Sequence, residues 1–279
     1  MATIDLISEV QGSVDEIFKA ESKKSLVTNT DYSWTGAHSI KVYKVTTAPM
    51  NDYNRNGSTT ASRYGVAEDL NAAFEEMTLK NDRSFAFVID TLDEDETAQA
   101  LNGASALARQ IREVVIPEVD SYVYKTMCEK AGTKPVAVKL TATNIYDKIV
   151  EATAALDNAE APETERCLIV SPTVYQYMKK SKDIVLETDI GEDMRLKGVI
   201  ANLDGLTVVK VPENRLPANF GFIVCHSVAT VAPTKLEKYV THVDPPGISG
   251  TLVEGRICYD AFVLDNKAKA VYYQEQTAE

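Results

Sequence analysis

The sequence has little of the chemistry on which metal sites and catalytic centres depend. Of its 279 residues, three are histidine, four are cysteine and one is tryptophan. The histidines, His38, His226 and His242, lack the spacing of a metalloprotease motif, and none lies within a few residues of a cysteine. The stretch Gly57-Ser-Thr-Thr-Ala-Ser lacks the Gly-Lys pair of a phosphate-binding loop. The sequence therefore predicts no metal site and no cofactor.

Clustered cysteines are also missing. Cys128, Cys167, Cys225 and Cys258 lie far apart in the chain, and three of them stand in apolar runs such as Arg166-Cys-Leu-Ile-Val. Disulfide frameworks and zinc sites place their cysteines at short, regular spacings. We therefore expect free thiols that are buried in the core.

Positive charge is scarce, with 29 basic against 41 acidic residues and a net charge of -12. A protein that binds phosphate backbones has an excess of basic residues. We therefore expect this chain to enclose any nucleic acid near it rather than to bind it. No run of about 18 apolar residues occurs, and the amino terminus has neither a basic opening nor an apolar stretch. We therefore expect no membrane association and synthesis in a cytoplasm.

The hydrophobic content of 44% is enough to fill a sizeable core, and the first 38 residues read as an arm outside it. The arm has apolar residues at helical spacing and then a polar stretch that leads to Trp34. Because a helix this short is marginal alone, it needs a surface to lie on, and we expect a neighbouring subunit to supply it. Lys19, Lys23 and Lys24 in the arm are outnumbered by acidic residues, so these lysines favour a solvated or subunit-facing surface over DNA contact. The acidic residues are Asp5, Glu9, Asp15, Glu16 and Glu21.

An extended segment follows the arm. Residues 40–45 read as a strand, and residues 46–73 have little periodicity and many turn formers, which is typical of a functional or disordered loop. Alternating apolar residues then predict strands on both sides of Asn81-Asp82, joined by a turn at these two residues.

The strongest helical pattern extends from Glu94 to Lys130. Asp93 and Glu96 have the spacing of a capping box, and an apolar stripe continues as far as Met127. Pro117 is expected to kink this helix or to end its first half. A continuous helix of this length would measure about 55 Å, which is longer than a small domain is wide.

Beyond Gly132 the pattern becomes that of an α/β subdomain. It predicts a helix over 145–156, a strand over 167–170 and a helix opened by Ser171-Pro172. Ser171 lacks the flanking glycines of a nucleophile elbow, so we interpret it as a helix cap. Further strands are expected at 207–211, 220–225, 256–263 and 268–273, with turns at Asp204-Gly205 and Asp265-Asn266, the last two strands forming a hairpin.

The order of these parts resembles the major capsid (coat) proteins of tailed double-stranded DNA bacteriophages, over nearly the whole chain. Stretches similar to that family appear in the family's order. They are Phe85-Ala-Phe-Val-Ile-Asp-Thr-Leu-Asp-Glu-Asp-Glu-Thr, Val115-Ile-Pro-Glu-Val-Asp, Arg166-Cys-Leu-Ile-Val-Ser-Pro-Thr-Val-Tyr, Leu196-Lys-Gly-Val-Ile-Ala-Asn-Leu-Asp-Gly-Leu-Thr-Val-Val-Lys-Val-Pro, Arg215-Leu-Pro and Gly255-Arg-Ile-Cys-Tyr-Asp-Ala-Phe-Val-Leu.

The resemblance implies an α+β chain with the tailed-phage capsid fold, which encapsulins share. It divides the chain into an amino-terminal arm (1–38), an extended β-hairpin loop (39–92), the spine helix of a peripheral domain (93–133), an α/β apical domain (134–230) and return strands (231–279).

The implied function is structural, without enzymatic activity. Copies would assemble in the host bacterial cytoplasm into hexamers and pentamers of an icosahedral virion capsid, which encloses double-stranded DNA without sequence-specific binding. Portal and scaffold proteins are the other expected partners. Family members that carry their own scaffold have many residues before the arm, and none precede it here, so we expect a separate scaffold or a processed chain.

On this resemblance the extended loop reaches over a neighbouring subunit. Aromatic residues and arginine are enriched at protein contacts, which makes six residues candidates for the subunit interface. They are Trp34, Tyr43, Tyr53, Arg55, Arg63 and Tyr64. Some family members join subunits through a loop lysine, but no lysine lies between Lys44 and Lys80, so we expect no such crosslink.

Two other hypotheses remain open. An encapsulin-like compartment shell has the same fold but packages enzymes instead of a genome. A soluble α/β enzyme would use carboxylates for acid and base chemistry, although no nucleophile or cofactor loop stands beside them. The candidate carboxylates are Glu187, Asp189, Glu192 and Asp193.

Overall fold

The computed structural model describes residues 21–29, 31–32, 39–45, 47–53, 55, 63–64, 72–96, 103–182, 184 and 202–277. The chain divides into two compact units, which are described separately. The hairpin unit consists of residues 34–79, and the main unit contains the rest of the chain.

The hairpin unit is built on two antiparallel strands, β1 (Ser39–Val45) and β2 (Ala72–Thr78). β1 lies where the sequence predicted a strand. Its register places Tyr43 opposite Phe74 and Lys41 opposite Glu76, so these four side chains share one face of the ribbon.

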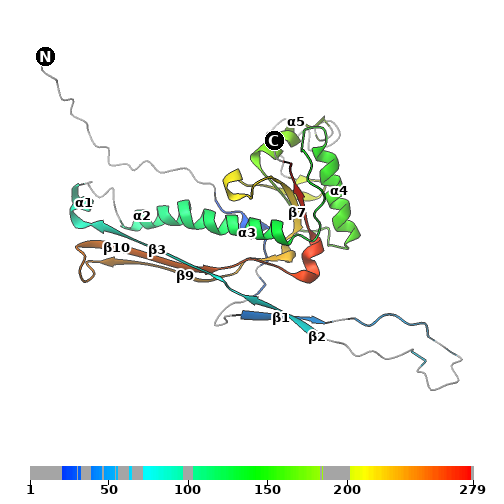
Figure 1. Ribbon diagram of the computed structural model, residues 1–279, viewed down its shortest axis with the longest axis horizontal. Coiled ribbons are helices and arrows are strands. Elements are labelled where there is room, and N and C mark those ends of the chain that lie inside the picture. Colours follow the sequence, from blue (N-terminus) through cyan, green and yellow to red (C-terminus); the bar gives the residue numbers. More distant parts are fainter. Residues whose placement is uncertain are drawn as a thin grey trace, which may run out of the picture. The chain divides into compact units, whose positions relative to one another are not determined.

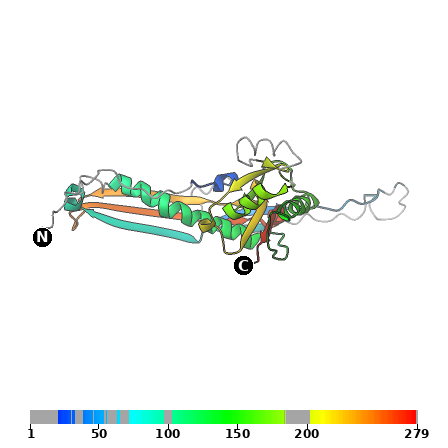
Figure 2. The same cartoon turned by 90° about the horizontal axis from the view of Figure 1, so that it is seen from above.

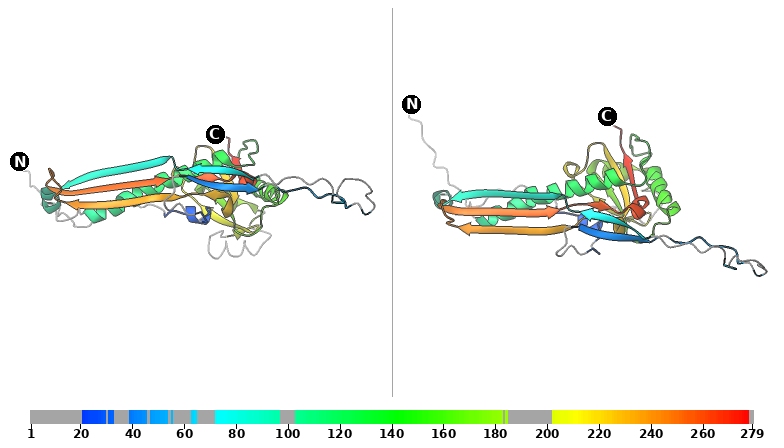
Figure 3. Two further views of the ribbon diagram at one scale, coloured as in Figure 1. Left: turned by 90° about the horizontal axis from the view of Figure 1, so that it is seen from below. Right: turned by 60° about the horizontal axis from the view of Figure 1, so that its bottom comes forward.

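A long three-stranded sheet forms one end of the main unit. Its order is β3-β10-β9, and all neighbours are antiparallel (Figure 1; Figure 3 shows the three strands side by side). The strands are β3 (Asn81–Asp90), β9 (Thr234–Val243) and β10 (Gly250–Tyr259).

The predicted turn at Asn81-Asp82 is wrong. Both residues belong to β3, opposite Tyr259 and Cys258 of β10, while β2 pairs with β1. The alternation of apolar residues identified the strands but not their partners. Alternation shows which side chains of one strand share a face, but it does not show which distant strand pairs with it. Asn81-Asp82 also lacks the glycine that a two-residue hairpin turn favours.

A long helix runs along this sheet, as Figures 1 and 2 both show. It passes from an α-helical to a π-helical and back to an α-helical hydrogen-bond pattern, and it is about 40 Å long. Its parts are α2 (Gly103–Gln110), η2 (the π-helix, Ile111–Val115) and α3 (Ile116–Lys130). We call this helix, Gly103 to Lys130, the spine.

Pro117 neither ends nor breaks the spine. It stands in the first turn of α3, directly after the π-helical turn. A π-helical turn shifts the hydrogen-bond register at the point where proline has no N–H to donate. Gly103 begins α2 very close to the sheet, since a Cβ there would lie 2.8 Å from Cγ2 of Thr251.

The expected capping box is also different in the structure. A separate short helix, α1 (Thr91–Glu96), already contains Asp93, and the residues between α1 and α2 lie outside the described residues. Asp90 performs the capping role, because its Oδ1 accepts a 2.9 Å hydrogen bond from the backbone N–H of Leu92.

The other end of the main unit is a five-stranded sheet of order β12-β7-β4-β6-β5, in which only β4 and β6 are parallel. Its helices α4 and α5 match the sequence predictions, and Ser171 caps α5 by accepting a 3.2 Å bond from Val174 N–H. The elements are α4 (Ile145–Asn158), β4 (Arg166–Val170), α5 (Pro172–Lys180), β5 (Asn202–Leu203), β6 (Leu206–Lys210), β7 (Phe220–His226) and β12 (Val271–Glu275).

Short elements connect the two ends of the main unit. They are η1 (Lys24–Leu26), η3 (Glu213–Arg215), η4 (Ser227–Ala229), β8 (Thr230–Val231), β11 (Phe262–Val263) and η5 (Asp265–Ala270). The predicted hairpin of the last two strands is wrong, because β10 pairs with β3 and β9, and β12 pairs with β7. Asp265-Asn266 opens a 3-10 helix, whereas Asp204-Gly205 does form the predicted turn, with φ of 50° and 73°.

Two apolar cores cover the two faces of the five-stranded sheet. Cys167 and Ile169 of β4 face α3, while Leu168 and Val170 face α4 and α5. This alternation follows from the period of two in a strand, and both faces are apolar because both are covered. All four cysteines are free, and Cys128, Cys167 and Cys225 are buried as expected.

The last part of the arm packs against its own chain. Val27 is fully buried in the core that faces α3, and Asn29 N–H donates a 2.7 Å hydrogen bond to the carbonyl of Thr230. The Cys167 thiol donates to the carbonyl of Leu26 at 3.3 Å. The expectation that a neighbouring subunit supplies the arm's surface is therefore wrong for residues 21–29.

Candidate assembly surfaces

The hairpin unit exposes one aromatic face. Tyr43 is 71% exposed and Phe74, directly opposite, is 55% exposed. The Lys41 ammonium lies 4.6 Å from the centre of the Phe74 ring, close enough for a cation–π contact. Two large rings that remain open to water on a two-stranded ribbon form an apolar surface that a partner can cover.

A second aromatic pair lies in the loop of the same unit. The rings of Tyr53 and Tyr64 meet edge to face, with their centres 5.0 Å apart, and both remain at least half exposed. Arg55 and Arg63 are exposed close to them in sequence. Of the six candidate interface residues, the structure brings these two tyrosines together, places Tyr43 on the hairpin face, and leaves Trp34 outside the described residues.

The sequence analysis missed Phe74 and Met50. Met50 is 99% exposed, and Phe74 becomes notable only once the register places it beside Tyr43. Apolar and polar residues alternate along 72–78, which could have indicated that Phe74 lies on one face of a strand. The partner strand decides which other side chains share that face, and the sequence did not identify the partner.

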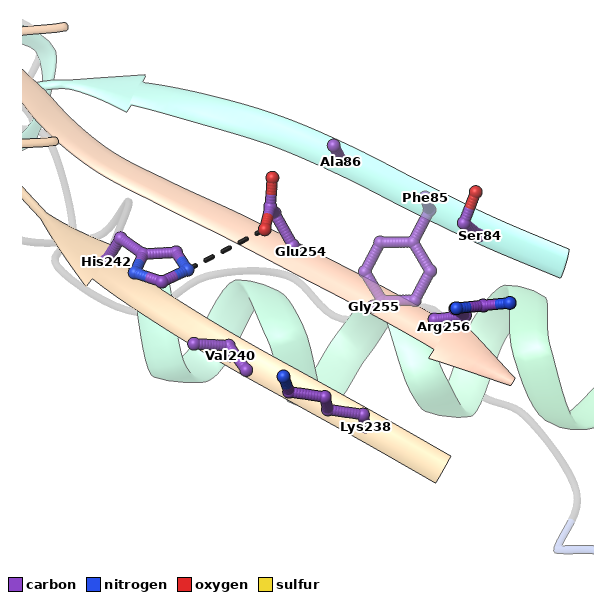
Figure 4. A pocket seen from close by; sticks show the side chains of 9 residues that line it. All are labelled: Ser84, Phe85, Ala86, Lys238, Val240, His242, Glu254, Gly255 and Arg256. Carbon is purple, nitrogen blue, oxygen red and sulfur yellow. Dashed lines mark ion pairs between the residues drawn. The ribbon is translucent and has the colours of Figure 1, made fainter. Parts of the chain in front are cut away.

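The face of the three-stranded sheet that points away from the spine has a groove of about 480 Å³ (Figure 4). Charged side chains from β9 and β10 border it. His242 Nε2 lies 3.6 Å from a carboxylate oxygen of Glu254, and Arg256 Nε donates to Asp82 Oδ1 at 2.9 Å. The hydrogen bond from Arg256 lowers the pKa of the Asp82 carboxyl.

Gly255 shapes the opposite side of β10, which faces the spine. A Cβ at that position would lie 2.3 Å from the ring of Phe85 and 2.9 Å from the ring of Tyr239. The Phe85 ring is in turn stacked with Phe87 and Tyr239, with ring centres 6.3 Å and 6.1 Å apart. The row of rings therefore crosses β10 only because residue 255 has no side chain.

A buried ionic cluster, which we call the arm clamp, joins the arm to the spine. It consists of Ser22, Asp120 and Arg215. Ser22 Oγ donates to Asp120 Oδ1 at 2.7 Å, and Arg215 Nη1 donates to Asp120 Oδ2 at 2.8 Å. Arg215 Nη1 also reaches the carbonyl of Glu21 at 3.3 Å. Three segments far apart in sequence are thereby fixed to one another.

A cavity of about 160 Å³ adjoins the arm clamp. Tyr124, one helical turn after Asp120, lines the cavity and is fully buried, and its hydroxyl has no hydrogen-bond partner among the described residues. Burial raises the pKa of that hydroxyl, so it remains protonated. Lys23 and Lys210 also line the cavity.

The described residues give little support to other site types. No group of three or more histidine, cysteine, aspartate or glutamate side chains in this part of the chain is placed to hold a metal ion. Within the same ranges, no helix has the length and apolar character to cross a membrane. The four carboxylates of the enzyme hypothesis, residues 187, 189, 192 and 193, lie outside the described residues.

Comparison with known proteins identifies a family and a fold. A family model described as phage capsid protein matches residues 78–274. A structure from Mycobacterium phage Che8 is 18% identical with a TM-score of 0.79, and the match covers 100% of both chains. The capsid structure of cyanophage P-SCSP1u is 14% identical with a TM-score of 0.78, and the match covers 99% of this chain and 94% of that chain.

A similar fold occurs in a virus-like particle. A virus-like particle from Pyrococcus furiosus is 12% identical with a TM-score of 0.58, and the match covers 91% of this chain and 92% of that one. The comparison with curated proteins finds no match. The predicted fold class is confirmed by the structural similarities.

Proposed function

The chain belongs to the phage capsid protein family and is a structural subunit of a virion capsid, and we propose that it forms hexamers and pentamers of an icosahedral shell around double-stranded DNA. We further propose that it has no enzymatic activity, that it assembles in the host bacterial cytoplasm, and that portal and scaffold proteins join it there. The net charge of -12 supports a shell that encloses DNA without binding its phosphates tightly.

The observation that carries this proposal is the exposed aromatic face of the hairpin unit. A two-stranded ribbon that leaves Tyr43 and Phe74 open to water is only marginally stable by itself. Contact with a second copy would remove both rings from water, and each large apolar side chain contributes about 1.5–3 kcal/mol when it is fully buried. A contact between different surfaces of two copies closes into rings when the rotation between them allows it.

We assign this contact to the hairpin unit and its loop. The interface residues in the proposal are Trp34, Tyr43, Tyr53, Arg55, Arg63, Tyr64 and Phe74. In the same proposal, residues 1–38 serve as arm, 39–92 as extended hairpin loop, 93–133 as spine, 134–230 as apical domain and 231–279 as return strands.

Negative-stain electron microscopy of the purified chain, with and without coexpressed scaffold, tests the proposal. Closed shells or rings of five and six copies are expected. Replacing Tyr43 and Phe74 together by serine should abolish these particles, while the matched change Tyr43→Phe, which keeps the ring, should leave them intact. A monomer under every condition would contradict the proposal.

The contents of the shell separate the two capsid-like hypotheses. The phage capsid family favours a genome container over an encapsulin-like enzyme compartment. Shells from infected cells should therefore hold DNA that resists added nuclease. A cargo protein in place of DNA would support the compartment instead.

A further inference from the structure

Two lysines that are distant in sequence lie beside the arm clamp, and a third lies close to one of them. Lys23 comes from the arm and Lys210 from the end of β6, and both line the cavity next to Tyr124. Lys210 and Lys179 lie on the same aromatic ring, with their ammonium groups 5.2 Å and 5.1 Å from the centre of Tyr175. The fold thus concentrates positive charge in a protein with an excess of acidic residues.

Two acidic residues line the cavity, and one of them is already paired. Asp120 is bound by Arg215 and Ser22. Glu21 is the remaining acidic residue at the cavity. Neither Lys23 nor Lys210 has an ion-pair partner within the described ranges, so the mouth of the cavity attracts an anion.

The residues that line the inside of the cavity also limit which ligand can bind there. The Tyr124 hydroxyl is buried and unpaired, which costs free energy in the isolated chain. Val211, Pro172 and Pro212 give the cavity apolar walls. A ligand that fits has a short apolar stem and ends in a group that accepts a hydrogen bond from Tyr124 and carries negative charge.

We propose that the cavity receives the carboxylate side chain of an aspartate or glutamate from a neighbouring copy of this chain. The ammonium groups of Lys23 and Lys210 pair with the carboxylate, and the Tyr124 hydroxyl donates a hydrogen bond to it. The inference rests on the proposed assembly into a shell, and the excess of acidic residues on each copy supplies the complementary charge.

Duplex DNA is the other polyanion in the proposed particle, but it fits the cavity poorly. Its phosphates lie on a stiff rod that does not enter a cavity of about 160 Å³, whereas a single side chain can. The geometry therefore favours a side chain.

Zero-length crosslinking tests the proposal. Shells are assembled from an equal mixture of ordinary and ¹⁵N-labelled chains, checked by electron microscopy, and treated with a water-soluble carbodiimide. The reagent joins a lysine amine to a carboxylate as an amide, and it is hydrated to a urea by the water that is removed. Mass spectrometry should find Lys23 or Lys210 linked to an acidic residue of the other isotopic form. Links only within one copy, or none from either lysine in well-formed shells, would overturn the proposal.

Variants make the test specific. Lys210→Met and Lys23→Met together should eliminate these intermolecular links, while Lys182→Met, at an exposed lysine outside the cavity, should retain them. Tyr124→Phe should leave the unassembled chain at least as stable as before, because it removes a buried unpaired hydroxyl, yet lower the denaturant concentration at which shells dissociate. Equal effects on chain and shell would count against the inserted carboxylate. Electron microscopy before crosslinking shows whether shells have formed. Absence of shells contradicts the proposed function, whereas absence of the crosslinks in well-formed shells contradicts only the inserted carboxylate.

Discussion

Arg215 and Asp120 form an almost fully buried ion pair, with 2.8 Å between Nη1 and Oδ2, although 95 positions separate them in the sequence. Their side chains are 2% and 1% exposed. Ser22 donates a further hydrogen bond to Asp120, so the carboxylate is satisfied from two sides. A pair in this position costs desolvation when it forms and costs more when one partner is lost.

Replacing Asp120 by asparagine should destabilise the chain strongly. The substitution removes the Asp120 carboxylate from the buried Arg215 guanidinium, and the loss of one partner costs about 3–5 kcal/mol in comparable buried pairs. The free energy of unfolding of the unassembled chain, measured in urea, checks this value. The expected consequence for function is loss of shells, because the arm is no longer fixed to the spine.

Two further variants serve as controls for this prediction. Asp120→Leu combined with Arg215→Met should recover most of the lost stability, since both charges of the buried pair are removed together. Glu129→Gln breaks an exposed pair with Lys125, in which N and O are 3.8 Å apart, and should cost less than about 0.5 kcal/mol. Equal losses from Glu129→Gln and Asp120→Asn would contradict the importance of burial.

A methyl group at residue 255 should disturb the row of rings on β10. Gly255→Ala places a Cβ about where the Phe85 ring now lies, and Phe85 is held between Phe87 and Tyr239. Overpacking of this kind costs about 1–3 kcal/mol. The cost should shrink in a Phe85→Leu background, where the closer of the two ring contacts is removed, and a double-mutant cycle measured by thermal unfolding tests that coupling. Strict additivity of the two substitutions would contradict it.

The sequence was sufficient for features that local chemistry decides. Ser171-Pro172 predicted the start of α5 because a capping hydroxyl and a proline in the first turn act within four residues. The turn at Asp204-Gly205 followed from residues that tolerate positive φ. The order of the landmark stretches identified the fold, since it reports the whole chain at once.

Features that depend on distant partners were out of reach. Nothing near Asp120 in the sequence indicates Arg215, and Lys23 looked like one charge in an acidic arm until the fold placed it beside Lys210. The partner of β3 was assigned to a neighbouring strand, whereas β10 lies about 170 residues away and completes the sheet. Pro117 alone predicted a kink or an end of the helix. The π-helical turn before it depends on how the spine packs, which the local sequence does not show.

Denaturing gels should show the coat protein only as a monomer. The hairpin unit has no lysine between Lys44 and Lys80, so its loop has no amine for a covalent bond to an asparagine of a neighbour. Mature shells boiled in detergent are therefore expected to give a single band near 30.6 kDa. A ladder of covalent multimers would refute this expectation.

The unfolding free energy of the chain should fall as the pH drops through the range where histidine titrates, because of His226. Burial lowers the pKa of His226 below its usual 6.5, and Arg166 and Lys267 act in the same direction against Glu165. The unfolded chain therefore binds a proton at a higher pH than the folded chain, which makes stability decrease below about pH 6.5, by at most about 1.4 kcal/mol per pH unit. Protonation at Nδ1 would also remove the acceptor of the 3.2 Å hydrogen bond from Val228 N–H. His226→Asn keeps an acceptor for that bond and should flatten the profile measured by urea unfolding between about pH 5.5 and 7.5, above the range of most carboxylates, whereas His242→Gln, at an exposed histidine, should keep the slope. An unchanged slope in His226→Asn would assign the pH dependence to another group.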